Sequence, residues 1–122
     1  MSKKVLVVDD SNAIRSQVSA ALGAAGFEVL EAKDGMDAMN KIMGAVELDL
    51  VVCDLNMPYI DGLKLVQFVK EHDRHAGLPF MMLTTEGHKD LIERARAAGA
   101  KAWMVKPVQS ERLVAAALKL TA

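Results

Sequence analysis

The 122-residue chain has few cysteines and aromatic residues and no linker, and each shortage excludes something. Its single cysteine, Cys53, cannot form a disulfide within the chain, so a reducing compartment such as the cytosol is expected. Aromatic residues make up only 4% of the sequence, so the core must consist of aliphatic side chains and methionine. No low-complexity stretch or change of composition interrupts the sequence, which predicts one domain over residues 1–122.

The sequence also lacks a strong excess of charge and a long hydrophobic run. Its formal net charge of −1 at pH 7 argues against nucleic acid as a partner, because nucleic-acid-binding domains carry a basic surface. The first apolar stretch ends at Val8, which is too short for a signal peptide, and no stretch is long enough to insert into a membrane. Apolar residues still make up 52% of the chain, enough for a folded core, and a cytoplasmic protein is expected.

Short apolar runs alternate with segments of helical periodicity. The runs predict strands at residues 5–8, 27–32, 49–54, 80–83 and 101–105. Helices are predicted at residues 12–25, 35–44, 62–70, 87–98 and 108–120. Ser11, Asp34 and Asp61 are expected N-caps, and Met36 and Leu118 are expected among the buried helical residues. Five strand–helix units with short connections indicate an α/β fold, a parallel sheet with helices on both faces.

The strand that ends at Asp54 is the most informative part of the chain. Leu50–Cys53 is apolar and rich in β-branched residues, as expected of a strand buried on both faces. Asn56 and Pro58 then stop the strand. Asp54 therefore lies at the edge of the sheet where open α/β folds bind ligands. Taken alone, Asp54 is more often a turn residue or a helix cap.

Polar residues follow the other strands in the same way. Asp9 and Asp10 end the first strand, Thr84 the fourth and Lys106 the fifth. Because the carboxyl ends of parallel strands meet at one edge, these side chains and Asp54 are expected to gather there. Separately each has an ordinary explanation as a cap, a turn or a solvated residue, but together they indicate a site.

The chemistry of this set is consistent. Three clustered carboxylates repel one another unless a cation lies among them, and Mg²⁺ prefers oxygen ligands and phosphate. An aspartate can act as a nucleophile and form an aspartyl phosphate. Such a transfer needs mainly positioning and neutralisation of phosphoryl oxygens, which Lys106 and Thr84 can contact. We therefore predict that Asp54 is the nucleophile and that Asp9 and Asp10 hold the metal.

At these residues the chain resembles the receiver domain of two-component response regulators, and the resemblance covers essentially the whole chain. The motifs that carry it stand in the family's order and spacing: Asp9-Asp10, the Asp-Leu-Asn-Met-Pro run from Asp54, Asp61-Gly62, Thr84 and Lys106-Pro107. The likeness is greatest to single-domain members that act in chemotaxis. It implies a flavodoxin-like (βα)5 fold with strand order 2-1-3-4-5, and it implies a Lys106-Pro107 peptide that is usually cis.

The resemblance also implies roles for the site residues. Asp54 would accept a phosphoryl group from a histidine kinase or a phosphotransfer protein. Mg²⁺ would be bound by Asp9, Asp10, Asp54 and the backbone carbonyl of Asn56. Lys106 would pair with the phosphate.

In this family a hydroxyl residue and an aromatic residue form the switch. Thr84 would move to bond the phosphate and Trp103 would swing inward, although tyrosine or phenylalanine is usual at that position and the larger indole favours a partial switch. Thr85 replaces a small residue beside the acyl phosphate. Asn56 and Glu86 match the residue types that tune dephosphorylation in chemotaxis members. The output would be a protein partner that binds about His88–Leu120.

Three other functions make different demands on the sequence. A Mg²⁺-dependent aspartyl-phosphate phosphohydrolase would need a general acid two residues after the nucleophile, where this chain has Asn56. A flavodoxin-like electron carrier would need a phosphate-binding loop after the first strand, where Asp9 and Asp10 would repel phosphate. A pseudo-receiver that signals without phosphate would not need the complete set of acids, hydroxyl and lysine.

Overall fold

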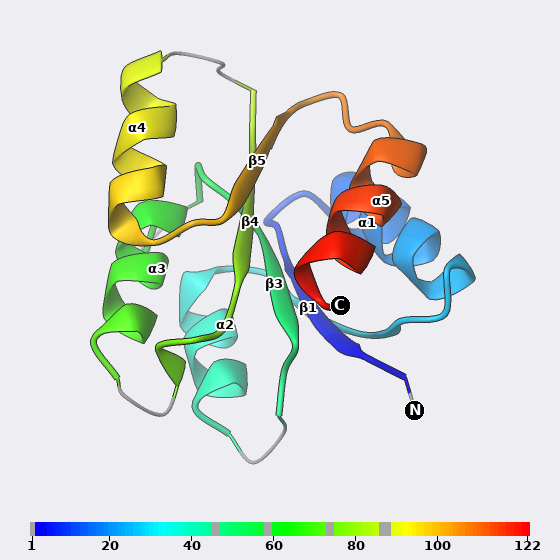
Figure 1. The fold of residues 1–122 in the computed structure, drawn as a ribbon, viewed down its shortest axis with the longest axis horizontal. Helices are drawn as coiled ribbons and strands as arrows, with labels where there is room; N and C mark the ends of the chain where they lie inside the picture. The colour runs from blue at the N-terminus through cyan, green and yellow to red at the C-terminus, as the bar shows by residue number, and fades with distance from the viewer. Residues whose placement is uncertain (1, 45–46, 58–59, 73–74, 86–88) are drawn as a thin grey trace.

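The computed structural model describes residues 2–44, 47–57, 60–72, 75–85 and 89–122. Over these residues, strands and helices alternate along the chain (Figure 1). The strands are β1 (Lys4–Val8), β2 (Glu28–Ala32), β3 (Leu50–Asp54), β4 (Phe80–Thr84) and β5 (Ala102–Val105). The helices are α1 (Asn12–Ala24), α2 (Gly35–Ile42), α3 (Gly62–Lys70), α4 (Lys89–Ala98) and α5 (Ser110–Leu120). Among the described residues, no helix is both long and apolar enough to cross a membrane.

The strands form one parallel sheet in the order β2-β1-β3-β4-β5. Helices α2, α3 and α4 cover one face of the sheet, and α1 and α5 cover the other (Figure 1). The parallel sheet with helices on both faces confirms the prediction from the strand–helix pattern, and the strand order is the flavodoxin-like order that the resemblance implied.

Each inner strand supplies side chains to both faces of the sheet. In β1, Leu6 and Val8 join the core under α2 to α4, whereas Val5 and Val7 join the core under α1 and α5. The apolar runs are continuous because both faces are buried. Strand β2 differs from the inner strands because it lies at an edge of the sheet, and two of its five residues are exposed.

Helix ends follow the predicted signals. The side chains of Ser11, Asp34 and Asp61 each accept a hydrogen bond from the backbone N–H three residues further on, at 3.3, 2.8 and 2.9 Å. Gly26 and Gly99 follow α1 and α4 with φ angles of +100° and +116°, a conformation that glycine adopts without strain. These signals place the helices, and through them the loops that carry the polar residues.

Two expected core residues are exposed. Met36 is 51% exposed and Leu118 is 53% exposed, so the prediction that they are buried is wrong. Each lies one residue after a buried position, Gly35 in α2 and Ala117 in α5, and is therefore rotated about 100° away from the buried stripe. Two further predictions fall outside the described residues: the helix start at Gly87 and the strand stop at Pro58.

Candidate functional site

The register of β1 and β3 brings two of the predicted acids together. Val8 lies opposite Cys53 in the parallel pair. Asp9 follows Val8 and Asp54 follows Cys53, so the two acids are neighbours at the carboxyl edge of the sheet. Both carboxylates are buried, with Asp9 1% and Asp54 5% exposed.

The ends of β4 and β5 bring the lysine to the same edge. Thr84 lies opposite Val105 at the ends of β4 and β5. The backbone N–H of Lys106 donates to the carbonyl of Thr84 at 2.7 Å, which extends the pairing by one residue. The start of the Lys106 side chain is thereby held at the same edge as Asp54, and the Lys106-Pro107 peptide is cis, as the resemblance implied.

Lys106 bridges the two buried acids. Its Nζ atom lies 3.2 Å from Oδ2 of Asp9 and 3.2 Å from Oδ1 of Asp54. Backbone N–H groups orient the same carboxylates, since Ser11 donates to Asp9 at 2.9 Å and Asn56 donates to Asp54 at 3.3 Å. The acids are therefore held in fixed positions around one ammonium group.

The electrostatics at Asp54 disfavour its negative charge. Burial raises the pKa of Asp54, and the adjacent Asp9 carboxylate raises it further, whereas Lys106 acts in the opposite direction. One lysine does not fully offset burial and repulsion. An additional cation at this edge would favour the ionised form, which is the form that can act as a nucleophile.

The donor set fits a hard divalent cation. Asp9, Asp10 and Asp54 each offer a carboxylate oxygen, and these oxygens lie within 4.8 Å of one another. Asp10 is exposed, which leaves the cluster open to solvent on one side. Oxygen ligands with room for water are what Mg²⁺ prefers. Asn56 is also exposed beside the cluster, and a metal-binding role for its carbonyl stays a prediction.

Leu55, the residue just after β3, lies close against the start of α3. The N–H of Gly62, the first residue of α3, donates to the carbonyl of Leu55 at 2.9 Å. A Cβ atom at position 62 would lie 2.7 Å from the carbonyl oxygen of Asp54 and 2.9 Å from the Cα of Leu55. Only glycine fits this approach, so α3 supports the backbone of Asp54 directly.

The predicted switch residues are placed as follows. Thr84 is buried at the end of β4, whereas Thr85 is exposed. Trp103 of β5 is half-buried against the core under α2 to α4, and the guanidinium carbon of Arg96 lies 4.9 Å from the centre of its ring. Glu86, a predicted tuning residue, lies outside the described residues. Cys53 is fully buried, and burial raises the pKa of its thiol, which makes it a poor nucleophile.

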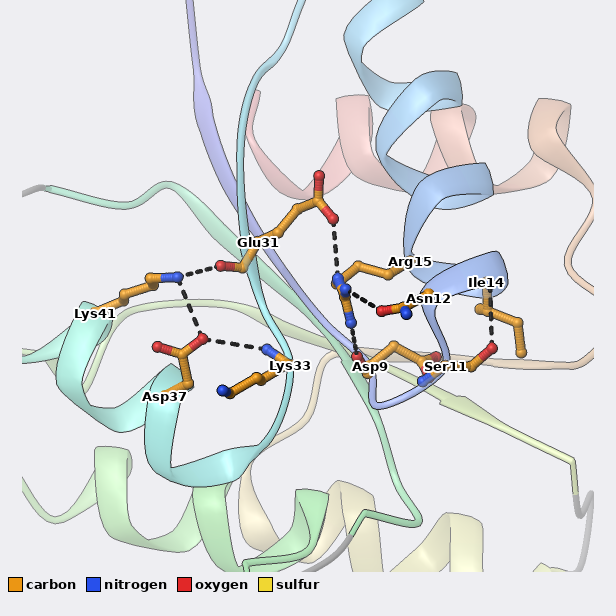
Figure 2. A network of polar contacts seen from close by, with 9 residues as sticks. All are labelled: Asp9, Ser11, Asn12, Ile14, Arg15, Glu31, Lys33, Asp37 and Lys41. Carbon is orange, nitrogen blue, oxygen red and sulfur yellow. Dashed lines mark hydrogen bonds and ion pairs between the residues drawn. The ribbon is translucent and has the colours of Figure 1, made fainter.

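Sequence reasoning missed Arg15, which contacts the site from α1 (Figure 2). Its Nη1 atom donates to the backbone carbonyl of Asp9 at 2.7 Å. Its Nε atom lies 2.9 Å from Glu31, and its Nη2 atom donates to Asn12 at 2.5 Å. One signal could have revealed it: a cation in the first turn of a helix opposes the helix dipole, so specific acceptors are needed nearby.

The contacts of Arg15 extend away from the site along β2 and α2 (Figure 2). Lys41 of α2 donates to the backbone carbonyl of Glu31 and lies 3.3 Å from Asp37. Asp37 also accepts a hydrogen bond from the backbone N–H of Lys33 at 3.2 Å. A polar network therefore runs from the carbonyl of Asp9 across the edge strand to α2.

Comparison with known proteins gives consistent matches. Residues 5–118 match the family model described as the response regulator receiver domain. The chain is 39% identical over 105 residues to chemotaxis protein CheY1 of Helicobacter pylori, covering 85% of each chain. It is 36% identical over 105 residues to a CheY homologue of Campylobacter jejuni, covering 85% of this chain and 81% of the other.

Solved structures agree with the sequence matches. The chemotaxis response regulator CheY4 of Vibrio cholerae superposes with a TM-score of 0.92 at 37% identity, covering 98% of this chain and 99% of the other. A response regulator described as putative, from Chloroflexus aurantiacus, superposes with a TM-score of 0.94 at 30% identity, covering 99% and 98%.

Proposed function

We propose that this chain, which belongs to the response regulator receiver domain family, accepts a phosphoryl group on Asp54 and thereby changes its affinity for a protein partner. The observation that carries the proposal is the site at the end of β3. There a buried Asp54 lies next to Asp9 and 3.2 Å from the ammonium group of Lys106. The chain is a signalling domain in this proposal, and the only reactions it promotes are its own phosphorylation and dephosphorylation.

In the proposed reaction, a carboxylate oxygen of Asp54 attacks the phosphorus of a phosphohistidine. The phosphorus–nitrogen bond breaks, and its electron pair stays on the imidazole nitrogen, which leaves and takes up a proton. Asp54 becomes an acyl phosphate. The Nζ atom of Lys106 already lies 3.2 Å from Asp54. After the transfer, Lys106 can therefore exchange its contact with the carboxylate for an ion pair with a phosphoryl oxygen.

Asp9, Asp10 and Asp54, with the carbonyl of Asn56, would hold Mg²⁺. When bound, Mg²⁺ supplies positive charge that offsets the repulsion among the carboxylates and between them and an incoming phosphoryl group. The chain's own contribution is to fix Asp9 and Asp54 with the N–H groups of Ser11 and Asn56, so that the carboxylates are already oriented.

The output would pass through Thr84 and Trp103. Thr84 would bond a phosphoryl oxygen, and Trp103 would move further inward and separate from Arg96, which now lies over its ring. The surface of α4, β5 and α5 carries the exposed Val105 and is the proposed contact for a downstream protein. Phosphate would shift an equilibrium between two existing conformations rather than create a new one.

The proposed partners are a histidine kinase or phosphotransfer protein upstream and a protein target downstream. The names of the chemotaxis proteins that this chain resembles support such a signalling role. We propose a cytosolic location, because the free, buried Cys53 fits a reducing compartment. Exposure of Thr85 and Asn56 leaves them at the solvent side of the site, where they would tune hydrolysis of the acyl phosphate together with Glu86.

The proposal is tested by incubating the protein with acetyl phosphate and measuring its intact mass, with and without Mg²⁺. We expect one phosphoryl group on the wild-type chain and none on Asp54→Asn or in the presence of a chelator. The fluorescence of Trp103, the only tryptophan, should change in step with the mass. Absence of any phosphoryl transfer, both from acetyl phosphate and from phosphohistidine proteins, would overturn the proposed phosphoacceptor function.

A further inference from the structure

The two acids of the β1–α1 loop are held to very different degrees. Asp9 is restrained at every polar group of its side chain: Ser11 donates to Oδ1 at 2.9 Å, and Lys106 lies 3.2 Å from Oδ2. Its N–H also donates to the carbonyl of Ala32 at 3.2 Å. Asp10 is exposed at the solvent side of the cluster. The direction of Asp10 therefore depends on the peptide that joins it to Asp9.

Arg15 binds that peptide at its oxygen. Nη1 donates to the Asp9 carbonyl at 2.7 Å, a short, charge-assisted hydrogen bond. Glu31 and Asn12 accept the Nε and Nη2 donors at 2.9 and 2.5 Å, and the Arg15 side chain is only 16% exposed. Because a guanidinium group is planar and rigid, these three acceptors fix the direction of its contact with the Asp9–Asp10 peptide.

We propose that Arg15 is a positioning residue for the metal site: by fixing the Asp9–Asp10 peptide, it keeps the Asp10 carboxylate beside those of Asp9 and Asp54. This inference rests on the proposed function, because it concerns the binding of Mg²⁺ at that cluster. Residues that orient metal ligands without touching the metal commonly change metal affinity by roughly 10- to 100-fold when they are replaced.

The sign of the effect separates positioning from simple electrostatics. Arg15 carries a positive charge close to a cation site, so by Coulomb's law alone its removal should strengthen Mg²⁺ binding. Loss of a fixed Asp10 should weaken it. A weaker affinity after the charge is removed therefore cannot be an electrostatic effect and reports the orientation of the ligands.

The same network offers a matched control. Lys41 has the same charge as Arg15 and contacts the other side of Glu31, at the backbone carbonyl, together with Asp37 (Figure 2). Its contacts are to β2 and α2 rather than to the Asp9–Asp10 peptide. Lys41→Gln thus removes an equal charge from the network while the contact between Arg15 and Asp9 stays in place.

The experiment is a Mg²⁺ titration of the whole chain, labelled with ¹⁵N and free of any phosphoryl donor, followed by amide chemical shifts. We expect Arg15→Gln to bind Mg²⁺ about 10-fold or more weakly than wild type. Lys41→Gln should stay within about twofold of wild type, because screened charges of the network contribute little. The amide spectrum also shows whether each variant is folded.

Two more variants make the result decisive. Arg15→Lys keeps the charge but loses the planar group, and it should also bind more weakly; it decides the matter if Arg15→Gln does not fold. Asp10→Asn should bind weakly, and adding Arg15→Gln to it should cause little further loss, because both changes remove the same contribution. Equal or tighter Mg²⁺ binding by the folded Arg15 variants would overturn the positioning role alone. Absence of Mg²⁺ binding by wild type would instead overturn the proposed metal site, and with it this inference.

Discussion

The two ends of the sheet carry similar charged groups in opposite surroundings. At the carboxyl end, Lys106 lies 3.2 Å from each of two carboxylates, and the three side chains are between 1% and 10% exposed. At the amino end, Lys4 and Glu28 lie 3.9 Å apart with 41% and 57% of their side chains exposed. The same kind of ion pair is therefore buried at one end and solvated at the other.

Burial, rather than the number of ion pairs, therefore distinguishes the end of the sheet that carries the proposed site. A solvated pair contributes little to folding because water and salt screen it. Buried charges are costly unless each has a partner, so a buried pair persists only where some other requirement keeps it. At the carboxyl end that requirement is the proposed phosphoryl transfer.

Removing the buried cation should cause the largest loss of stability. Lys106→Met leaves Asp9 and Asp54 buried side by side, and loss of one partner from a buried pair typically costs about 3–5 kcal/mol of the free energy of unfolding. Urea unfolding at neutral pH without Mg²⁺ measures the change. The matched control is Lys119→Met in the last turn of α5, where the lysine is exposed and the loss should stay below about 0.5 kcal/mol. Equal losses for the two variants would contradict the contrast.

Removing one buried acid should have the opposite sign and depend on pH. Burial and the Asp9 carboxylate raise the pKa of Asp54 in the folded chain above its ordinary value in the unfolded chain. At a pH between these two pKa values, the folded chain therefore holds a proton on Asp54 that the unfolded chain has released. Stability is therefore lost as pH rises through that window. Asp54→Asn removes this loss and should therefore be more stable than wild type at neutral pH without Mg²⁺.

The measurement is urea unfolding of the wild type and of Asp54→Asn between about pH 4 and pH 8. The advantage of Asp54→Asn should shrink as pH falls toward the ordinary carboxyl pKa, and excess Mg²⁺ should reduce it at neutral pH by stabilising the wild-type chain. Asp10→Asn changes an exposed neighbour and serves as the control, with a change below about 0.5 kcal/mol. An advantage that does not change with pH would show that the charge of Asp54 is not its cause.

The smallest effect is expected at the amino end. Lys4→Met should change the free energy of unfolding by no more than about 0.5 kcal/mol, because its ion pair with Glu28 is exposed. The coupling between Lys4→Met and Glu28→Gln in a double-mutant cycle should fall toward zero in 1 M salt. A coupling as large as that of the buried groups would remove the distinction between the two ends.

Much of the fold could be predicted because its signals are local. The apolar runs of β1, β3 and β4 are buried on both faces, and the caps at Ser11, Asp34 and Asp61 form the expected hydrogen bonds. The gathering of acids and lysine followed from one rule, that parallel strands end at the same edge. That rule needs no knowledge of side-chain contacts, which is why it succeeded.

What could not be predicted depends on direction around a helix or on contacts between distant residues. Met36 and Leu118 lie just outside the buried stripe of their helices, a boundary that periodicity alone does not define. Arg15 reaches Glu31, 16 residues away, and no spacing rule links a helix to the edge strand in this way. The switch role of Trp103 stays a prediction, because one conformation does not show a change.

The close approach at Gly62 has a consequence for mutational tolerance. Any side chain there meets the backbone of Asp54 and Leu55 within 3 Å, whereas a Cβ at Gly23 in α1 meets nothing within 4 Å. Selection for folding alone would therefore discard every substitution at position 62, whatever its polarity, while position 23 accepts many. Selection at position 62 therefore acts first on the size of the side chain and only then on its chemical character. Variation at this position is limited even in a chain that never meets a phosphoryl donor.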